Sequence, residues 1–498
     1  MRVPCGHVPV PVPVAVSAFL AGVISCVSDQ GPTQPPPPRL AFVAPPSATV
    51  DGQAIAPAVQ VAALDASGNV VTTATDQVTL ALAGNGAAAT LSGTLTVAPI
   101  QGIATFSDLR INPPGNYALT ASAPGLTGAT SASFAITLAF AAVSPGEQHT
   151  CGLTTDGTGY CWGDNTDGQL GDGTASSIAR LTPASVAGRL VFAALSAGFR
   201  RTCGIATGSA AYCWGYNGEG YLGDGTMTNR LSPAAVTGGL AFAAVNASSS
   251  HTCGVTTAGA AYCWGANSYG QLGDGTTTPR TRPTAVLGGL TFASVATGYA
   301  HTCGVTTGGA VYCWGYNGAG ELGDGTKIDR VIPAAVASGL TFGSLSAGSF
   351  HTCAVTTGGA AYCWGQNVSG ELGDGTAIGR TSPVAVLGGL TLAAVSTGSA
   401  HNCGVTPDGI VYCWGRNGEG ELGDGTTTDR SRPTLATSLV TAGLNVAMLR
   451  TGAFHTCVVT TGSAAYCWGK NAYGQLGDGT TTNRLVPVRI GPPARVGP

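Results

Sequence analysis

Hydrophobic and polar positions alternate in short runs along most of the chain, and between Phe140 and Ile490 these runs recur in seven similar copies. The copy from His301 to Thr326 reads HTCGVTTGGAVYCWGYNGAGELGDGT. Periods near fifty residues are typical of propellers and solenoids. One C-W-G tripeptide marks each copy, and its tryptophans, 52, 50, 50, 50, 50 and 54 residues apart, are Trp162, Trp214, Trp264, Trp314, Trp364, Trp414 and Trp468.

Each copy divides into four segments that alternate like β-strands: F-A-A-V-S-x-G, H-T-C-G-V-T, A-Y-C-W-G and the residues around proline in S-P-A-A-V. Four strands per unit make one propeller blade. In the third segment, Tyr312 and Trp314 share one face and Cys313 lies on the other. Neighbouring blades would then pack an aromatic face against a face of cystine and valine. The sequence therefore predicts an all-β chain with a seven-bladed propeller at 138–492 and a tail at 493–498.

A second pattern of apolar alternation covers residues 39–137. Segments such as VQVAALD, QVTLALAG, GIATFSDLRI and NYALTASA are separated by Gly, Pro and Asn turns, which predicts a sandwich of about seven strands. The region resembles the bacterial immunoglobulin-like domains of surface proteins, and Tyr117 lies where such domains often carry a tyrosine corner. The resemblance implies a spacer or adhesive module.

The amino terminus has the pattern of an export segment, residues 1–26. Arg2 precedes an apolar stretch from Val8 to Ile24, which is followed by Ser25 and Cys26. This resembles a bacterial lipoprotein signal and implies lipidation of Cys26; an ordinary cleaved signal and an uncleaved anchor are the alternatives. Residues 27–38 include four consecutive prolines and predict a semi-rigid linker. We expect a protein that is secreted or held in the cell envelope, with membrane contact only through this anchor.

Fourteen of the sixteen cysteines form pairs separated by nine residues around a turn. A hairpin places such cysteines opposite each other, where a disulfide is possible. Zinc is the alternative, but the short C-x2-C knuckles that it favours are absent from the sequence. Seven disulfides would indicate an oxidising compartment. The pairs are Cys151/Cys161, Cys203/Cys213, Cys253/Cys263, Cys303/Cys313, Cys353/Cys363, Cys403/Cys413 and Cys457/Cys467.

Charged residues make up only 9% of the chain, the formal net charge is -3, and the lysines are Lys327 and Lys470. Nucleic acid is therefore not an expected partner, because counterion release needs a basic surface. The sequence also lacks a nucleophile elbow and a GxxxxGK phosphate loop. We predict a monomer that is not an enzyme and needs no cofactor or metal.

Histidine and acidic residues recur at fixed places in the repeat, which favours structural roles. The histidines, replaced by Arg201 in the second copy, are expected to hydrogen-bond within the fold; a metal or proton channel is the alternative. Aspartate in each L-G-D-G-T loop suits a turn, with calcium as the alternative, foremost at Asp164, Asp167 and Asp172. The glutamates at 321, 371, 419 and 421 are expected in solvent. The histidines are His149, His251, His301, His351, His401 and His455.

The motifs H-T-C-G-V-T, Y-C-W-G and N-x-x-G-x-L-G-D-G-T resemble the repeats of the regulator of chromosome condensation family. The resemblance covers about 350 of the 498 residues and implies a seven-bladed propeller. The family includes nucleotide-exchange factors for a small nuclear GTPase, ubiquitin-ligase modules and a secreted bacterial inhibitor of beta-lactamases. The export signal and paired cysteines make the secreted inhibitor the closer analogy. An exchange factor or other intracellular regulator and a propeller hydrolase are the alternatives.

Two sets of positions change between copies while their neighbours stay fixed, and we predict that one of them binds a protein or other macromolecule. Drift at unconstrained loop tips is the alternative. The first set lies before the histidine and contributes Phe199, Arg200, Tyr299, Phe350 and Phe454. The second lies around the asparagine that follows C-W-G and contributes Tyr216, Tyr269, Tyr316, Arg416 and Tyr473.

Overall fold

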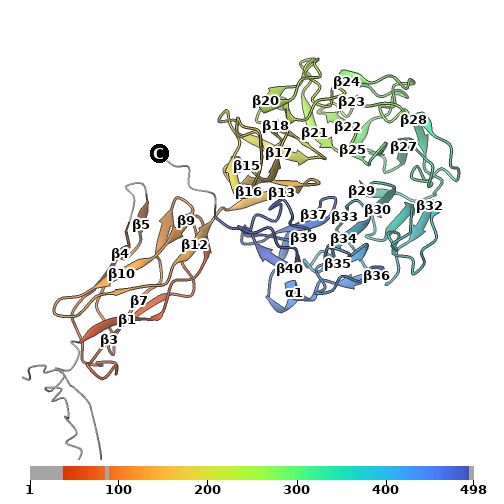
Figure 1. Ribbon diagram of the computed structural model, residues 1–498. Coiled ribbons are helices and arrows are strands. Elements are labelled where there is room, and N and C mark those ends of the chain that lie inside the picture. Colours follow the sequence, from red (N-terminus) through yellow and green to blue (C-terminus); the bar gives the residue numbers. More distant parts are fainter. Residues whose placement is uncertain (1–37, 85–88, 493–498) are drawn as a thin grey trace, which may run out of the picture.

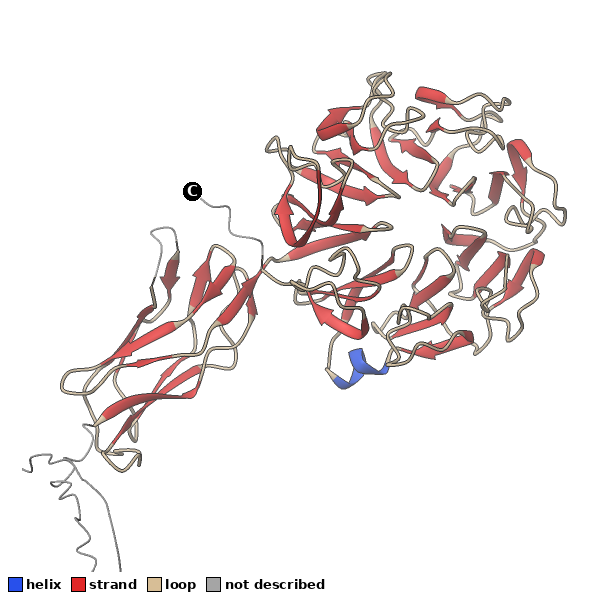
Figure 2. Cartoon of the chain, viewed as in Figure 1, coloured by secondary structure: helices blue, strands red, loops and turns tan. Residues whose placement is uncertain are grey.

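The computed structural model describes residues 38–84 and 89–492, which form an N-terminal β domain and a ring of seven blades (Figure 1). The predicted export segment with Cys26 and the linker up to residue 37 lie outside the described residues, as does the tail at 493–498. Among the described residues, no helix is long and apolar enough to cross a membrane. The short helix α1 (Thr437–Thr441) connects the sixth and seventh blades (Figure 2).

The described residues of the N-terminal domain form twelve short strands where about seven were predicted, because turns and irregularities divide the apolar segments. They pair as β1-β3-β7, β11-β10-β4-β6, β2-β12-β9 and β5-β8. The strands are β1 (Arg39–Ala44), β2 (Thr49–Val50), β3 (Val59–Leu64), β4 (Val78–Leu82), β5 (Thr90–Ser92), β6 (Thr96–Val97), β7 (Ile103–Phe106), β8 (Arg110–Asn112), β9 (Gly115–Tyr117), β10 (Leu119–Ser122), β11 (Ala129–Thr130) and β12 (Phe134–Thr137).

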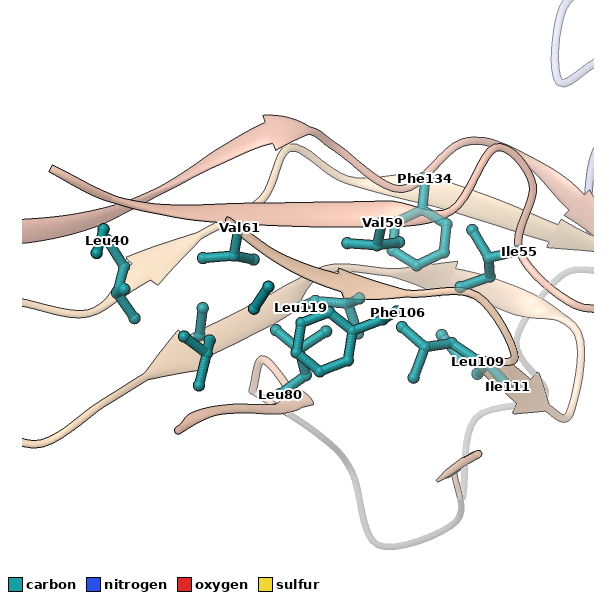
Figure 3. Close-up of a cluster of buried hydrophobic side chains, with 14 of the residues drawn as sticks. Leu40, Ile55, Val59, Val61, Leu80, Phe106, Leu109, Ile111, Leu119 and Phe134 are labelled. Carbon is teal, nitrogen blue, oxygen red and sulfur yellow. The ribbon is translucent and has the colours of Figure 1, made fainter. Parts of the chain in front are cut away.

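One hydrophobic core holds these sheets together. Alternate residues of β3, β4, β7 and β10 point inward, so that Val59, Val61, Leu80, Phe106 and Leu119 are at most 1% exposed (Figure 3). At one end of the domain, the Tyr117 hydroxyl donates a hydrogen bond of 2.6 Å to the Pro113 carbonyl. The bond joins the tyrosine to backbone four residues upstream, which is the contact that the predicted tyrosine corner requires.

Each blade of the ring is one antiparallel four-stranded sheet from a continuous segment, as predicted. Its first strand lines the centre and its fourth lies outermost (Figure 1). The first four blades are β13 (Phe140–Pro145), β14 (His149–Thr154), β15 (Gly159–Asn165) and β16 (Ser176–Ser185); β17 (Phe192–Ala197), β18 (Arg201–Ala206), β19 (Ala211–Gly215) and β20 (Arg230–Ala235); β21 (Phe242–Ala247), β22 (His251–Thr256), β23 (Ala261–Gly265) and β24 (Arg280–Ala285); and β25 (Phe292–Thr297), β26 (His301–Thr306), β27 (Val311–Gly315) and β28 (Arg330–Ala335).

The other three blades repeat the same order. They are β29 (Phe342–Ala347), β30 (His351–Thr356), β31 (Ala361–Gly365) and β32 (Arg380–Ala385); β33 (Ala394–Thr397), β34 (His401–Val405), β35 (Val411–Gly415) and β36 (Arg430–Leu435); and β37 (Val446–Thr451), β38 (His455–Thr460), β39 (Ala465–Gly469) and β40 (Arg484–Arg489).

The blades pack through the two faces that the strand periodicity predicted. In the fourth blade, Cys303 on β26 lies opposite Cys313 on β27, and the two form a disulfide. This disulfide and Val305 pack against Trp364 of the fifth blade.

All seven predicted cysteine pairs form disulfides of this kind, one in each blade, so the zinc alternative is wrong for these sulfurs. Every one of the paired cysteines is 0% exposed. They therefore belong to the scaffold between blades and not to a binding surface. Seven buried disulfides also indicate an oxidising environment. The bridges are Cys151–Cys161, Cys203–Cys213, Cys253–Cys263, Cys303–Cys313, Cys353–Cys363, Cys403–Cys413 and Cys457–Cys467.

The ring closes without exchange of a strand between its first and last blades. Trp162 of the first blade packs against the Cys457–Cys467 disulfide of the seventh, and its indole nitrogen donates to the Gln475 carbonyl at 2.9 Å. The other blades pack on their neighbours in the same manner, so the closing joint resembles the rest.

The N-terminal domain attaches at this closing joint. Arg489, the last residue of β40, donates to the Ala48 carbonyl at 3.1 Å and to the Thr137 hydroxyl at 2.9 Å. Leu138, in the connection between the domains, is 4% exposed and belongs to the core shared by the first and seventh blades. The domain connection is therefore bonded to both ends of the propeller.

Candidate functional site

Both variable sets lie on the same end of the ring. In each blade, the turn between the first two strands meets the end of the third strand, because β14 and its equivalents run antiparallel to β15 and its equivalents. A backbone N–H of the second set donates to a carbonyl of the first set in all seven blades, at 2.8 to 3.0 Å. We call this end of the ring the loop face. These pairs are Asp164/Gln148, Tyr216/Arg200, Ala266/Ser250, Tyr316/Ala300, Gln366/Phe350, Arg416/Ala400 and Lys470/Phe454.

Four of the predicted aromatic residues touch one another across the third, fourth and fifth blades. The ring of Tyr316 lies 5.1 Å from that of Tyr269 and 6.3 Å from that of Phe350, both edge-on. Phe350 also lies 5.5 Å from Tyr299. Tyr269 and Tyr299 are 43% and 47% exposed, so that two of the four rings reach solvent side by side with half-buried neighbours. We call these four residues the aromatic cluster.

The remaining predicted residues form smaller contacts around the loop face. Arg416 and Lys470 hold their charges 5.1 and 5.0 Å from the centre of the Phe454 ring. Arg200 lies over Tyr216 and pairs with Asp167 at 2.5 Å. Cations over aromatic faces are stabilised by about 0.5 to 2 kcal/mol.

Two predicted aromatic residues stand outside these contacts. Tyr473 is 36% exposed, and Phe199 lines the mouth of the central channel together with Tyr299 of the aromatic cluster.

Three glutamates that were expected in solvent are buried beneath the loop face. Glu321, Glu371 and Glu421 are at most 1% exposed, whereas Glu419 is half-buried. The prediction failed because the L-G-D-G-T turn folds back against the next blade: the Glu321 carbonyl accepts hydrogen bonds from Trp364 and Thr352 of that blade. Burial raises the pKa of Glu321 to about 7 and that of Glu421 above its usual range.

A titratable group of the first blade also lies on the loop face. Burial raises the pKa of the half-buried Glu147 to about 7, and the charges of Lys470 and Arg200 only partly oppose this rise.

The six histidines bond neighbouring blades, as the structural interpretation predicted. His301 Nε2 lies 3.0 Å from Thr352 Oγ1, which donates in turn to the Glu321 carbonyl at 3.0 Å. Since the hydroxyl donates to the carbonyl, it accepts from the histidine, which is the Nε2–H tautomer. The bonds of the other histidines go to Thr202, Thr302, Asn402, Thr456 and Thr150.

Burial lowers the pKa of these histidines, to about 4 for His149 and about 3 for His301, His401 and His455, so they are neutral. Arg201 takes the histidine position in the second blade and bonds Thr252 and the carbonyls of Ser249 and His251.

The aspartates of the L-G-D-G-T loops are held by protein groups. Asp324 accepts hydrogen bonds from the Thr326 backbone and hydroxyl and pairs with Arg330 at 2.7 Å. The arginine partner lies at the start of the outer strand in six blades and within it, as Arg180, in the first. Sequence reasoning missed this contact, although an arginine six or eight residues after each aspartate was visible.

The first copy, where an ion was considered, has its acidic groups paired within the protein. Asp164 bonds Thr166 and Gln169, and Asp167 pairs with Arg200. Asp172 pairs with Arg180. Within the described part of the chain, no group of three His, Cys, Asp or Glu side chains could hold a metal ion.

A central channel with a cavity of about 560 Å³ opens between the first strands of the blades. Ser144 and Ser196 on these strands accept the N–H groups of Ala197 and Ala247 in the next blade. In the seventh blade, Arg450 stands at the position that these serines occupy. The residue of the first blade that would donate to it, Pro145, has no N–H group. Arg450 is therefore exposed in the channel, another residue that sequence reasoning missed.

Comparisons with known proteins agree with this architecture. The family model of the RCC1-like domain matches residues 115–449, and two models of the regulator of chromosome condensation (RCC1) repeat match residues 449–475 and 464–496. The structure of human WBSCR16 has 20% identity and a TM-score of 0.62, covering 66% of this chain and 93% of that chain. Prp20p from Saccharomyces cerevisiae has 20% identity and a TM-score of 0.59, covering 68% and 87%.

At these identities, the two structures show a shared fold. The family matches begin at residue 115 and leave most of the N-terminal domain unassigned. Since the RCC1-like domain match alone spans more than half of the 498 residues, this chain belongs to the family of RCC1-like propellers.

Proposed function

We propose that this protein is an exported, non-catalytic binding protein that recognises another protein through the loop face of its propeller. The observation that carries the proposal is the meeting of the two variable sets on one end of the ring, where the aromatic cluster presents Tyr269 and Tyr299 to solvent. Exposed aromatic residues next to arginine are the usual anchors of protein interfaces. The scaffold beneath is rigid because every blade carries a disulfide.

The seven disulfides also support export, since cytosolic thiols are kept reduced. They count against the intracellular alternative, a nucleotide-exchange factor. We propose a monomer, held in the cell envelope by lipidated Cys26 or secreted, without nucleic acid as partner. The N-terminal domain, with its tyrosine corner at Tyr117, is proposed to be an immunoglobulin-like spacer.

The test compares two variants of the full-length protein that change equal numbers of exposed apolar side chains. The first carries Tyr269→Ser, Tyr299→Ser and Tyr473→Ser on the loop face. The control carries Val191→Ser, Leu387→Ser and Val440→Ser, which lie at the opposite end in connections between blades and are 47%, 38% and 49% exposed.

Each variant and the wild type are immobilised and incubated with secreted and envelope proteins of the source cells. A retained protein is then purified and its Kd measured by calorimetry. We expect the loop-face variant to bind at least about tenfold more weakly while the control binds like the wild type. A partner that binds all three forms equally well would place recognition elsewhere and refute the proposal.

A further inference from the structure

In several L-G-D-G loops, the side chain before the leucine forms a hydrogen bond with a residue of the loop face. Gln169 donates to Asp164 at 2.6 Å, and Glu371 accepts from Gln366 at 3.3 Å. In the third blade, Gln271 donates to Ser250 at 3.4 Å. The residue before the leucine therefore connects the buried core to the loop face in these blades.

Glu321 in the fourth blade lacks such a contact. One carboxyl oxygen accepts from the Ala319 N–H at 2.9 Å, but the other, Oε1, is buried without a hydrogen-bond partner among the described residues. Oε1 of Glu421 in the sixth blade and Nε2 of Gln475 in the seventh are likewise buried without a hydrogen-bond partner in the described part of the chain. The equivalent of Ser250 in the fourth blade is Ala300, which has no polar side-chain atom. The Glu321 side chain is 0% exposed, so an ionised carboxylate at this place is desolvated and half-partnered, an unfavourable arrangement.

The sixth blade shows which group lies beside the equivalent carboxylate. There Arg416 Nε lies 3.8 Å from Oε1 of the equivalent glutamate, Glu421, an ion pair without a hydrogen bond. The Arg416 guanidinium also lies 5.1 Å from the centre of the Phe454 ring of the next blade. The guanidinium thus occupies a place between a buried carboxylate and an aromatic face. Both interactions favour a cation.

The fourth blade has the same two walls without the cation. Glu321 stands where Glu421 does, and Phe350 of the next blade stands where Phe454 does. Tyr316 replaces Arg416, and its hydroxyl lies over Gly318, where an added Cβ would collide with it. The glycine leaves room for the ring to lie against its own loop, partly exposed.

We infer that the place between Glu321 and Phe350 binds an ammonium or guanidinium group at the end of an aliphatic chain, namely a lysine or arginine side chain of the protein partner. The identity of the partner as a protein rests on the proposed function. Tyr316 turns aside to admit the cation, and Tyr269 and Tyr299 contact the aliphatic chain. The external cation then occupies the place that Arg416 fills in the sixth blade.

The experiment uses full-length protein with carbon-13-labelled tyrosine rings, titrated with small probes and followed by NMR. The probes are N-acetyl-lysine methylamide, N-acetyl-arginine methylamide and n-butylammonium, with uncharged N-acetyl-norleucine methylamide as the control. We expect the Tyr316, Tyr269 and Tyr299 signals to shift with a Kd of order 1 mM for the cations, and no saturable shift for norleucine. Equal binding of norleucine would overturn the inference.

Three variants separate the cation site from general effects. Glu321→Gln, which installs the residue found at this position in the first, third and seventh blades, should weaken binding at least about tenfold. Tyr316→Arg should abolish it by supplying the blade-six guanidinium. Glu371→Gln should leave it unchanged, because that carboxyl already has a partner. Wild-type affinity in Glu321→Gln would refute the site.

A pH series gives a second readout. The charged and titratable groups near Glu321 are Asp329 and Tyr316 of its own blade, and His301 and His351 on the strands packed beside it are buried and neutral. Since the pKa of Glu321 is about 7, its proton must leave before a cation pairs with it. Affinity should therefore fall roughly tenfold from pH 8 to pH 6 in the wild type and not in Glu321→Gln.

The two proposals fail separately. If the cation probes bind as expected but no partner depends on the loop face, the proposed function fails and the site stands. If a partner binds through the loop face with equal affinity for wild type and Glu321→Gln, the cation site is excluded as its anchor and only this inference is overturned.

Discussion

Thr352 is one of the residues that hydrogen-bond the fourth blade to the fifth, and its hydroxyl forms two of these bonds, so its replacement by valine tests the joint directly. Valine has the same shape but no hydroxyl. The change removes the bond from His301 Nε2 and the bond to the Glu321 carbonyl, each 3.0 Å long. The carbonyl keeps its bond from the Trp364 indole, whereas the histidine N–H is left buried without a partner.

The expected cost follows from these contacts. A lost hydrogen bond lowers stability by about 0.5 to 1.5 kcal/mol, and an unsatisfied buried donor by about 1 to 3 kcal/mol. Thr352→Val should therefore lower the free energy of unfolding by about 2 to 4 kcal/mol. Thr352→Asn is the matched control, because Asn402 already serves at this position: it accepts from His351 at 2.8 Å and donates to the Glu371 carbonyl at 2.6 Å. It should cost less than about 1 kcal/mol.

Both variants are measured by urea unfolding at pH 7.5, with disulfides intact and tryptophan fluorescence as the signal. A shift of the midpoint at constant slope reports the change in stability. If valine is as stable as threonine, or if asparagine is as damaging as valine, the hydroxyl does not join the blades as argued.

Three further outcomes follow from the same contacts. Because the folded-state pKa values of the buried histidines lie below 6.5, the stability that they provide is complete above pH 6.5 and is lost as the pH falls toward about 4. Carboxyl groups with raised pKa values, among them Glu147, Glu321 and Glu421, oppose this effect but are fewer than the six histidines. The urea midpoint should thus be lower at pH 5 than at pH 7, and an equal or higher midpoint would contradict neutral histidines. Non-reducing peptide mass spectrometry should find seven disulfides, each within one blade, and their reduction should cost about 2 to 3 kcal/mol per bridge; free thiols in protein from its own cells would argue against export. Arg489→Ala should broaden the distribution of interdomain distances in small-angle scattering, whereas Arg484→Ala, which breaks an ion pair with Asp478 within one blade, should not.

The propeller was predictable because each copy of the repeat contains the alternation of apolar and polar residues that forms its four strands. The placement of Trp314 and Cys313 on opposite faces, and hence the packing of tryptophan on cystine, follows from the period of a strand. The cysteine pairs were predictable from the hairpin between them. Strand periodicity and hairpin spacing both depend on residues that are close together in the sequence, so they can be read from one copy of the repeat.

Contacts between blades were harder to predict because they join residues about fifty positions apart. Nothing near Thr352 in the sequence indicates that it bonds His301, and Glu321 reads as a polar loop residue until its turn is seen to fold against the next blade. The two variable sets were identified, but their meeting on one face depends on the antiparallel register of the second and third strands.

The attachment of the N-terminal domain has a mechanical consequence. If the domain tethers the propeller to a surface, a pulling force enters the ring between its first and last blades. Arg489 of the last strand hydrogen-bonds Thr137 in the connection, and Leu138 is packed between both blades. The force is therefore shared by the first and last blades and does not act on the first blade alone. The ring is thereby protected from opening at the one joint that has no covalent link across it.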